Sequence, residues 1–314
     1  MTGTVLQGIN NIFTVRTAGA VQLYRLKGKI LNEGSQGPPE YNPLAPGDEV
    51  VLEEGQIVSR LPRANQLYRW NRKRNCMQIA AANVDQLLLF GSICEPPLRP
   101  RFIDRALVMS EWSRLPAVVI INKADLGGAQ QDMERIAVYQ SLGYRVLMIS
   151  AHTGQGLPEL ADICRGSRSV LFGQSGVGKS TCINSLFPAV DLKTGDVSRK
   201  HNRGRHTTNY GRLLTAAELG ADSAETEIID TPGIRELHVM GFSEVEIAYG
   251  FREIRARADR CSYSSCTHLH EPDCAVRLAV QEKSIHPDRY TSYANTVADM
   301  QDLSRQFGVP EFET

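Results

Sequence analysis

The sequence lacks net charge, a long apolar run and a secretory leader. Its 35 lysines and arginines balance 35 aspartates and glutamates over 314 residues, so the total charge indicates no class of partner. No apolar run approaches the ~20 residues that span a bilayer, and no hydrophobic secretory segment is present at the N-terminus. We therefore expect a cytoplasmic protein with no membrane partner. With 42% hydrophobic and 22% charged residues, the composition is that of a globular protein of about two or three domains.

The seven cysteines are scattered except for a group near the C-terminus. Three of the seven cysteines lie within the stretch from Cys261 to Cys274. In a reducing compartment, grouped cysteines are metal ligands more often than disulfides. The other four are expected to be packing residues: Cys76, Cys94, Cys164 and Cys182.

This C-terminal group has the spacing of a metal site. Three thiolates and one imidazole lie within fourteen residues, which is enough to close a tetrahedral zinc site with no open position. Such a site is structural rather than catalytic. His270 competes with His268 as the fourth ligand, and the one-residue gap after Cys266 favours His268. The predicted zinc ligands are Cys261, Cys266, His268 and Cys274.

One stretch has the pattern of a phosphate-binding loop. Residues 169–180 read SVLFGQSGVGKS, a short apolar strand that runs into GxxxxGK[ST]. In this pattern, backbone N–H groups surround the phosphates of a nucleoside triphosphate at the start of a helix. Lys179 is expected to reach the β- and γ-phosphates, and Ser180 to bind Mg²⁺. The predicted phosphate contacts are Gly173, Gln174, Ser175, Gly176, Val177, Gly178, Lys179, Ser180 and Thr181.

Two further motifs indicate that the base is guanine. Residues 122–125, NKAD, follow an apolar strand, so they lie where open α/β sheets bind ligands. The Asp125 carboxylate can accept hydrogen bonds from guanine N1–H and the 2-amino group, which adenine does not offer. Ser150 and Ala151 end another strand and resemble the loop behind the guanine. The predicted base contacts are Asn122, Lys123, Asp125, Ser150 and Ala151.

The fourth motif, DTPG at residues 230–233, matches DxxG. In that motif Asp230 holds Mg²⁺ through water and the amide of Gly233 senses the γ-phosphate. In an ordinary Ras-like GTPase the motifs follow one another along the chain as phosphate-binding loop (P-loop), switch I, DxxG, NKxD and the SAx loop behind the guanine. In this chain NKxD and the Ser150–Ala151 loop come first, and the P-loop, switch I and DxxG follow. The order indicates a circular permutation, which preserves the geometry because all these loops lie at one edge of a single sheet.

The periodicity of the chain predicts three regions. Residues 1–76 contain short strands and, from residue 62, a basic linker; the strands suit an OB-fold, an SH3-like barrel or a meander equally well. Residues 77–242 alternate strands with helices, which predicts an α/β domain with a mainly parallel sheet. Residues 243–314 have a helical composition. Helices are expected over residues 243–257, 274–284 and 287–307.

Basic residues gather in two segments although the total charge is zero. Between residues 56 and 86 only Asp85 is acidic, and Tyr68 and Trp70 are interleaved with six basic residues. Residues 197–217 contain five basic residues and no acid. Taken alone, each segment is either a solvated loop or a surface that contacts nucleic acid.

Together these motifs resemble a known family, the circularly permuted GTPases called RsgA or YjeQ that mature the bacterial small ribosomal subunit. The resemblance covers nearly the whole chain and is carried by NKAD, GQSGVGKST, GRHTT, DTPGIRE and CxxxxCxHxxxxxC. It implies an OB-fold, a Mg²⁺-dependent GTPase domain and a C-terminal helical domain with one structural Zn²⁺. It also implies a monomer that binds the small ribosomal subunit and its rRNA with GTP, late in maturation, and leaves after hydrolysis to GDP.

Two points about catalysis stay open. Thr207 or Thr208 is expected to bind Mg²⁺, and Asn209 stands where related chains often have a third threonine. Ile234 occupies the position of the glutamine that orients the attacking water in many GTPases, so another group must do so. The resemblance marks His206, and the alternative is that His206 contacts RNA and ribosomal RNA supplies the group. The predicted catalytic residues are His206, Lys179 and Gly233.

A rival interpretation is an RNA-binding scaffold in which nucleotide is structural and turnover incidental. The intact Lys179, Ser180 and Asp230 argue against it.

Overall fold

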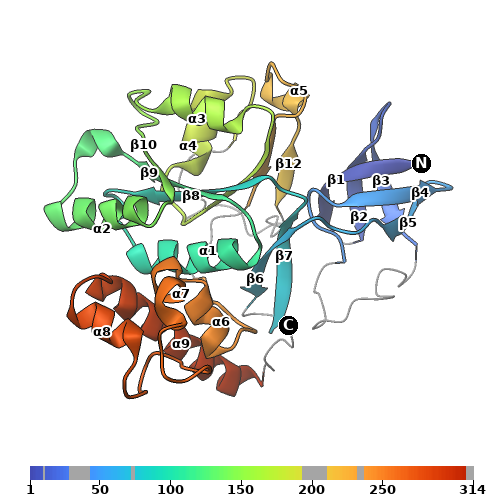
Figure 1. Ribbon diagram of the computed structural model, residues 1–314. Helices are drawn as coiled ribbons and strands as arrows, with labels where there is room; N and C mark the ends of the chain where they lie inside the picture. The colour runs from blue at the N-terminus through green and yellow to red at the C-terminus, as the bar shows by residue number, and fades with distance from the viewer. Residues whose placement is uncertain (10, 28–42, 72–74, 193–210, 232–236, 309–314) are drawn as a thin grey trace.

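The N-terminal strands close into a barrel, drawn in blue in Figure 1. The computed structural model describes residues 1–9, 11–27, 43–71, 75–192, 211–231 and 237–308. The barrel order is β1-β2-β3-β5-β4, and β3 and β5 pair in parallel. The parallel pair excludes a meander, and a five-stranded barrel closed in this order is the expected OB-fold. The strands are β1 (Thr2–Ile9), β2 (Ile12–Arg16), β3 (Val21–Leu26), β4 (Glu49–Glu53) and β5 (Gln56–Arg60).

A hairpin follows the barrel where the sequence suggested only a basic linker. Strands β6 (Gln66–Asn71) and β7 (Cys76–Ala82) pair antiparallel. Leu67 and Trp70 are buried on β6, while Arg69 donates across the hairpin to Gln78 Oε1 at 2.8 and 3.0 Å. The basic composition hid this strand, because the partner of the Arg69 guanidinium lies on the other strand of the hairpin.

The central sheet has six strands in the order β10-β9-β8-β11-β13-β12. All neighbours are parallel except β12 and β13, which confirms the mainly parallel sheet. Residues 87–90 of β8 are fully buried, as a strand covered on both faces requires. The strands are β8 (Gln86–Ser92), β9 (Ala117–Asn122), β10 (Arg145–Met148), β11 (Arg168–Gly173), β12 (Arg212–Leu214) and β13 (Glu227–Asp230).

Helices cover both faces of this sheet. In Figure 1, α3 and α4 lie on one face and α1 on the other. They are α1 (Pro100–Trp112), α2 (Gln130–Ser141), α3 (Leu157–Cys164), α4 (Lys179–Leu186) and the short α5 (Ala216–Leu219). Because β8, β9, β10, β11 and β13 are mutually parallel, their carboxyl ends meet at one edge, where ligands bind in open α/β sheets.

The barrel is attached to the strand that carries the DxxG motif. Glu227 begins β13 and is 4% exposed. Its carboxylate pairs with Arg16 of the barrel at 2.5 Å and with Arg168 of β11 at 2.6 Å. The barrel and the phosphate-binding strands therefore share one buried carboxylate.

The C-terminal helices pack beneath α1 and are drawn in orange and red in Figure 1. They are α6 (Glu244–Tyr249), α7 (Arg252–Ala258), α8 (Ala275–Gln281) and α9 (Pro287–Phe307). The single helix expected over residues 243–257 is wrong, because the chain breaks at Gly250 and Phe251. A Cβ on Gly250 would lie 2.7 Å from Val108 Cγ1, so α1 approaches too closely for an ordinary side chain. No helix in the described ranges is long and apolar enough to cross a membrane.

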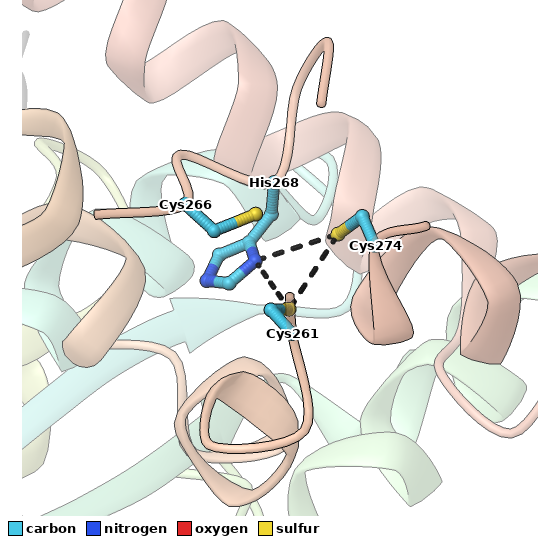
Figure 2. A group of neighbouring side chains, drawn as sticks. All are labelled: Cys261, Cys266, His268 and Cys274. Carbon is cyan, nitrogen blue, oxygen red and sulfur yellow. Dashed lines mark hydrogen bonds between the residues drawn. The ribbon is translucent and has the colours of Figure 1, made fainter. Parts of the chain in front are cut away.

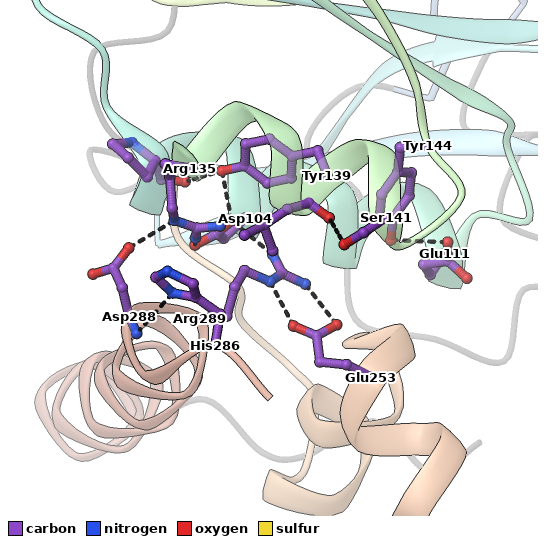
Figure 3. Close-up of polar contacts among 12 residues, drawn as sticks. Asp104, Glu111, Arg135, Tyr139, Ser141, Tyr144, Glu253, His286, Asp288 and Arg289 are labelled. Atoms are coloured by element: carbon purple, nitrogen blue, oxygen red, sulfur yellow. Dashed lines mark hydrogen bonds and ion pairs between the residues drawn. The ribbon is translucent and has the colours of Figure 1, made fainter. Parts of the chain in front are cut away.

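A buried ionic network fastens these helices to the sheet domain (Figure 3). Arg289 of α9 is 1% exposed and pairs at 2.6 Å with both Asp104 of α1 and Glu253 of α7. Asp104 also accepts from Arg135 of α2 at 2.6 Å and from the Tyr139 hydroxyl at 2.8 Å. Four helices from two regions of the chain thus meet on one carboxylate and one guanidinium.

Candidate nucleotide site and metal centre

The predicted phosphate loop lies between β11 and α4, at the carboxyl end of a central strand. Gly176 and Gly178 have φ values of 83° and 91°, which favour glycine. A Cβ on Gly178 would lie 2.2 Å from the side-chain amide nitrogen of Asn122, so a larger residue would displace that amide. Lys179 is 8% exposed, and its ammonium donates to the carbonyls of Gly173 and Gln174 at 2.8 Å each. The loop therefore has its anion-binding shape with a buried cation behind it.

Lys179, the first residue of α4, and Asp230, at the end of β13, influence each other electrostatically. Burial lowers the pKa of Lys179 to about 8, and the nearby Asp230 carboxylate opposes that shift. Burial raises the pKa of Asp230, and Lys179 opposes that shift in turn. Each charge is costly here without a counter-charge, so a triphosphate with a divalent cation would complement both groups.

Asn122 joins three of the predicted motifs. Its side-chain amide donates to the Val177 carbonyl of the phosphate loop at 2.9 Å, and its Oδ1 accepts from the Ala151 amide at 3.1 Å. Ser150 is fully buried and its Oγ accepts from the Thr153 amide at 3.0 Å, which shapes the same loop. Asn122 and Ser150 thus hold the loops in place in this structure, whereas Asp125 is exposed at the edge.

For the other predicted nucleotide and magnesium residues, the structure gives a position on the chain or leaves them outside the described ranges. Ser180 and Thr181 lie in the first turn of α4, and Ser175 is exposed in the loop before it. His206, Thr207, Thr208 and Gly233 lie outside the described residues.

One polar clamp was missed by the sequence analysis. Asn184 of α4 donates to the Leu192 carbonyl at 2.8 Å and accepts from the Leu192 amide at 2.9 Å. It therefore fixes the backbone directly before residues 193–210, the range of the sequence that contains Thr207 and Thr208. An asparagine five residues after the phosphate-loop lysine was the only signal, and spacing alone gives it no partner.

The Cys/His cluster forms within the C-terminal helices (Figure 2). The four ligand atoms of Cys261, Cys266, His268 and Cys274 all lie within 4.8 Å of one another. His268 Nδ1 is 3.5 Å from the sulfurs of both Cys261 and Cys274. Burial lowers the pKa of His268, which favours the neutral imidazole that binds metals. The group could hold a metal ion, and His270 is exposed outside it.

The loop that carries these ligands is held from two sides. Glu271 accepts from the amides of Thr267, Leu269 and His270 at 2.6 to 3.1 Å. The Tyr290 hydroxyl of α9 donates to the His268 carbonyl at 2.8 Å, and His268 itself has a φ of 63°. The histidine is therefore positioned by its backbone, with its Nδ1 toward the sulfurs.

Comparison with known sequences settles the family. Residues 60–240, more than half of the chain, match the sequence profile described as RsgA GTPase. The chain belongs to the RsgA GTPase family. Its phosphate loop and NKAD motif lie inside the matched range, and the chain is a GTP-hydrolysing enzyme of that family.

Relatives of this RsgA-family chain align over nearly its whole length. A protein of Borrelia garinii subsp. bavariensis, named "Small ribosomal subunit biogenesis GTPase RsgA", is 37% identical over 303 residues, which cover 94% of this chain and 95% of the relative. A protein of the same name from Porphyromonas gingivalis is 36% identical over 314 residues, covering 95% and 97%.

Solved structures agree on the fold of the whole RsgA-family chain. The crystal structure of YjeQ from Thermotoga maritima superposes with a TM-score of 0.71 at 28% identity, over 96% of this chain and 98% of that one. YloQ, whose title calls it a circularly permuted GTPase, gives 0.65 at 25% identity over 96% and 95%. The expected permuted fold is therefore confirmed.

Proposed function

We propose that this chain is an assembly factor of the small ribosomal subunit. It binds the subunit and its rRNA in the GTP state, acts late in maturation, and leaves when hydrolysis produces GDP. The observation that carries this proposal is the alignment of nearly the whole chain with relatives named for small ribosomal subunit biogenesis. A GTPase of this kind works in the cytoplasm, and we propose that it does so as a monomer.

The nucleotide would bind at the carboxyl edge of the central sheet. Lys179 contacts the β- and γ-phosphates, while Ser180 and Asp230 hold Mg²⁺ directly and through water. Asp125 selects guanine. Asn122 of NKAD bonds to Val177 of the P-loop and to Ala151, so these motifs lie side by side in space, which supports this arrangement. Thr207 or Thr208 completes the Mg²⁺ shell, and the amide of Gly233 contacts the γ-phosphate.

Three modules would divide the work. We propose an RNA-binding OB-fold with its basic linker over residues 1–76, a GTPase domain over 77–242 and a helical domain over 243–314. The Cys/His cluster fits one structural Zn²⁺, because thiolate and imidazole donors suit that ion and all four positions come from the protein. Zn²⁺ there would stabilise the helical domain and take no part in hydrolysis.

His206 would orient the attacking water, because Ile234 cannot. The change His206→Ala is expected to lower the subunit-stimulated kcat by ~10²-fold or more, with nucleotide and subunit affinity little changed, since orientation matters only as the transition state forms. If the variant instead loses subunit binding while bound enzyme turns over normally, His206 contacts RNA and the water is oriented by another group.

The test of the whole proposal is the rate of GTP hydrolysis with and without purified small subunits. We expect strong stimulation by small subunits and none by large subunits. A pull-down with a non-hydrolysable GTP analogue should retain the protein on small subunits, and GDP should release it. A rate that does not respond to subunits, together with nucleotide-independent binding, would support the rival RNA-binding scaffold.

A further inference from the structure

The loop between β8 and α1 lies at the nucleotide edge but belongs to none of the recognised motifs. It begins at Ser92, which is 1% exposed at the carboxyl end of β8 and pairs with Asn122 of the NKAD strand. The Ser92 hydroxyl donates to the carbonyl of Pro96 at 2.6 Å. The next amide, that of Ile93, donates to the Asn122 carbonyl at 3.0 Å. The first bond closes a turn from Ser92 to Pro96, and the second anchors the start of the loop to the end of β9.

This loop contacts the base motif and the phosphate loop at once. The ammonium of Lys123, in NKAD, donates to the Glu95 carbonyl. Cδ of Pro96 lies 3.6 Å from the position that a Cβ on Gly176 would occupy. The carbonyl that holds Lys123 and the ring that abuts the phosphate loop are therefore neighbours in sequence, and one serine hydroxyl fixes the turn that contains them.

We propose that Ser92 is a positioning residue for the guanine nucleotide and acts through Lys123. By closing the turn onto Pro96, Ser92 aims the Glu95 carbonyl at the Lys123 ammonium. The lysine is then held extended before nucleotide arrives, and its aliphatic stem forms a fixed apolar surface beside Asp125. This inference rests on the proposed binding of guanine at NKAD.

The physical gain is pre-organisation. Lysine has one of the largest side-chain entropies, and ordering it on binding would weaken affinity by roughly threefold to tenfold. With its ammonium already bound to the Glu95 carbonyl, the protein meets that cost on folding. The gain concerns the base, not the γ-phosphate, so it is the same for GDP and GTP.

The test is a double-mutant cycle on the full-length protein with Ser92→Ala and Lys123→Met, read as the affinity for fluorescent GDP and for a fluorescent non-hydrolysable GTP analogue. Methionine keeps the apolar stem of Lys123 and removes the ammonium. We expect Ser92→Ala to weaken both nucleotides by about fivefold, with the loss in KM rather than kcat. In the Lys123→Met background, Ser92→Ala should have no further effect.

Two variants guard against a simple folding defect. Ser92→Thr keeps the hydroxyl and should bind nucleotide within about twofold of the natural chain. Glu95→Gly fits the φ of 51° at an exposed position and loosens the same turn, so it should weaken nucleotide binding and should lose that effect in the Lys123→Met background.

The outcomes separate this inference from the proposed function. Additive effects of Ser92→Ala and Lys123→Met would overturn the positioning role, as would a Ser92→Ala variant with unchanged affinity. If Asp125→Asn weakens binding but Lys123→Met does not, guanine still binds at NKAD and only the inference fails. If neither weakens binding, the proposed base site itself is wrong.

Discussion

The Cys/His cluster and the nucleotide edge are built in opposite ways. The cluster takes its four ligand atoms from fourteen consecutive residues, between Cys261 and Cys274. The nucleotide edge takes its groups from the ends of β9, β10, β11 and β13, spread over residues 122–231. A cluster of this kind is fixed by local spacing, whereas the edge exists only once the parallel sheet has formed.

Each site nevertheless depends on one polar side chain that contacts several backbone groups. At the cluster this is Glu271; burial alone would raise its pKa, but hydrogen bonds from Thr267 and His270 prevail and lower the pKa to about 2. At the edge it is Asn122, which bridges the phosphate loop and Ala151. The local site thus uses a charged group that orders its own loop, and the dispersed site uses a neutral amide between two loops.

The largest expected effect is at the cluster, with Cys266→Ser. Because metal binding and folding of a small Cys/His module are coupled, the variant should lose nearly all of its zinc and loosen α6 to α8. GTP should still bind, since the sheet edge shares no ligand with the cluster. Metal analysis, hydrogen exchange of the helices and nucleotide titration measure the three parts.

The matched control is His270→Ala, which removes the exposed imidazole outside the group. It should keep about one zinc per chain. Loss of zinc in the control, or substantially less than one zinc in the natural protein purified without chelator, would contradict the assignment of ligands.

The second prediction concerns the buried ionic network around Arg289, which holds the C-terminal helices independently of the metal site. Arg289→Met removes the cation that pairs with the buried Glu253, and it leaves Asp104 with Arg135 as its remaining cation (Figure 3). The free energy of unfolding of the docked helices should fall by about 3–5 kcal/mol, with zinc retained. Urea denaturation measures it, and Arg305→Met on the exposed end of the same helix is the control. Equal stability of the two variants would mean that the network contributes little.

The third prediction concerns the dispersed site. Asp125→Asn should weaken GTP by ~2–4 kcal/mol, because the carboxylate no longer accepts from N1–H and the 2-amino group. The same variant should gain affinity for xanthine nucleotides, whose base offers the complementary pattern. Competition binding measures both, with the exposed Asp162→Asn as control. Unchanged GTP affinity would remove NKAD from the site.

The contrast between the sites also explains how much the sequence could predict. Cys261, Cys266, His268 and Cys274 were predictable as a group because their spacing is local. The phosphate loop and NKAD were predictable as motifs, and the permuted order correctly predicted one sheet edge. The contacts of Ser92 and Asn184 were not, because each depends on which backbone carbonyl tertiary packing brings within reach.

The features of the fold that the sequence did not predict also depend on tertiary packing. The strand β6 was hidden because Arg69 pairs with Gln78 across the hairpin, a contact that the local sequence does not indicate. The break between α6 and α7 was hidden because Gly250 alone does not end a helix; the close approach of Val108 requires it. By contrast, α9 begins at Pro287 and ends at Phe307 as expected, since a proline at its start and a glycine after its end are local signals.

The smallest expected effect concerns the proton on Lys179. Burial lowers its pKa to about 8, so between pH 8 and its unfolded value near 10.5 the unfolded chain holds more protons than the folded chain. Stability of the ligand-free protein should therefore rise across that window, as the penalty of the buried ammonium disappears. Nucleotide affinity should move the other way, because bound phosphates favour the charged lysine and raise its pKa again. Calorimetry in two buffers of different ionisation enthalpy should show up to about one proton taken up per GDP near pH 9 and almost none near pH 6.5. Equal proton uptake at the two pH values would mean that the Lys179 ammonium stays charged in the ligand-free loop.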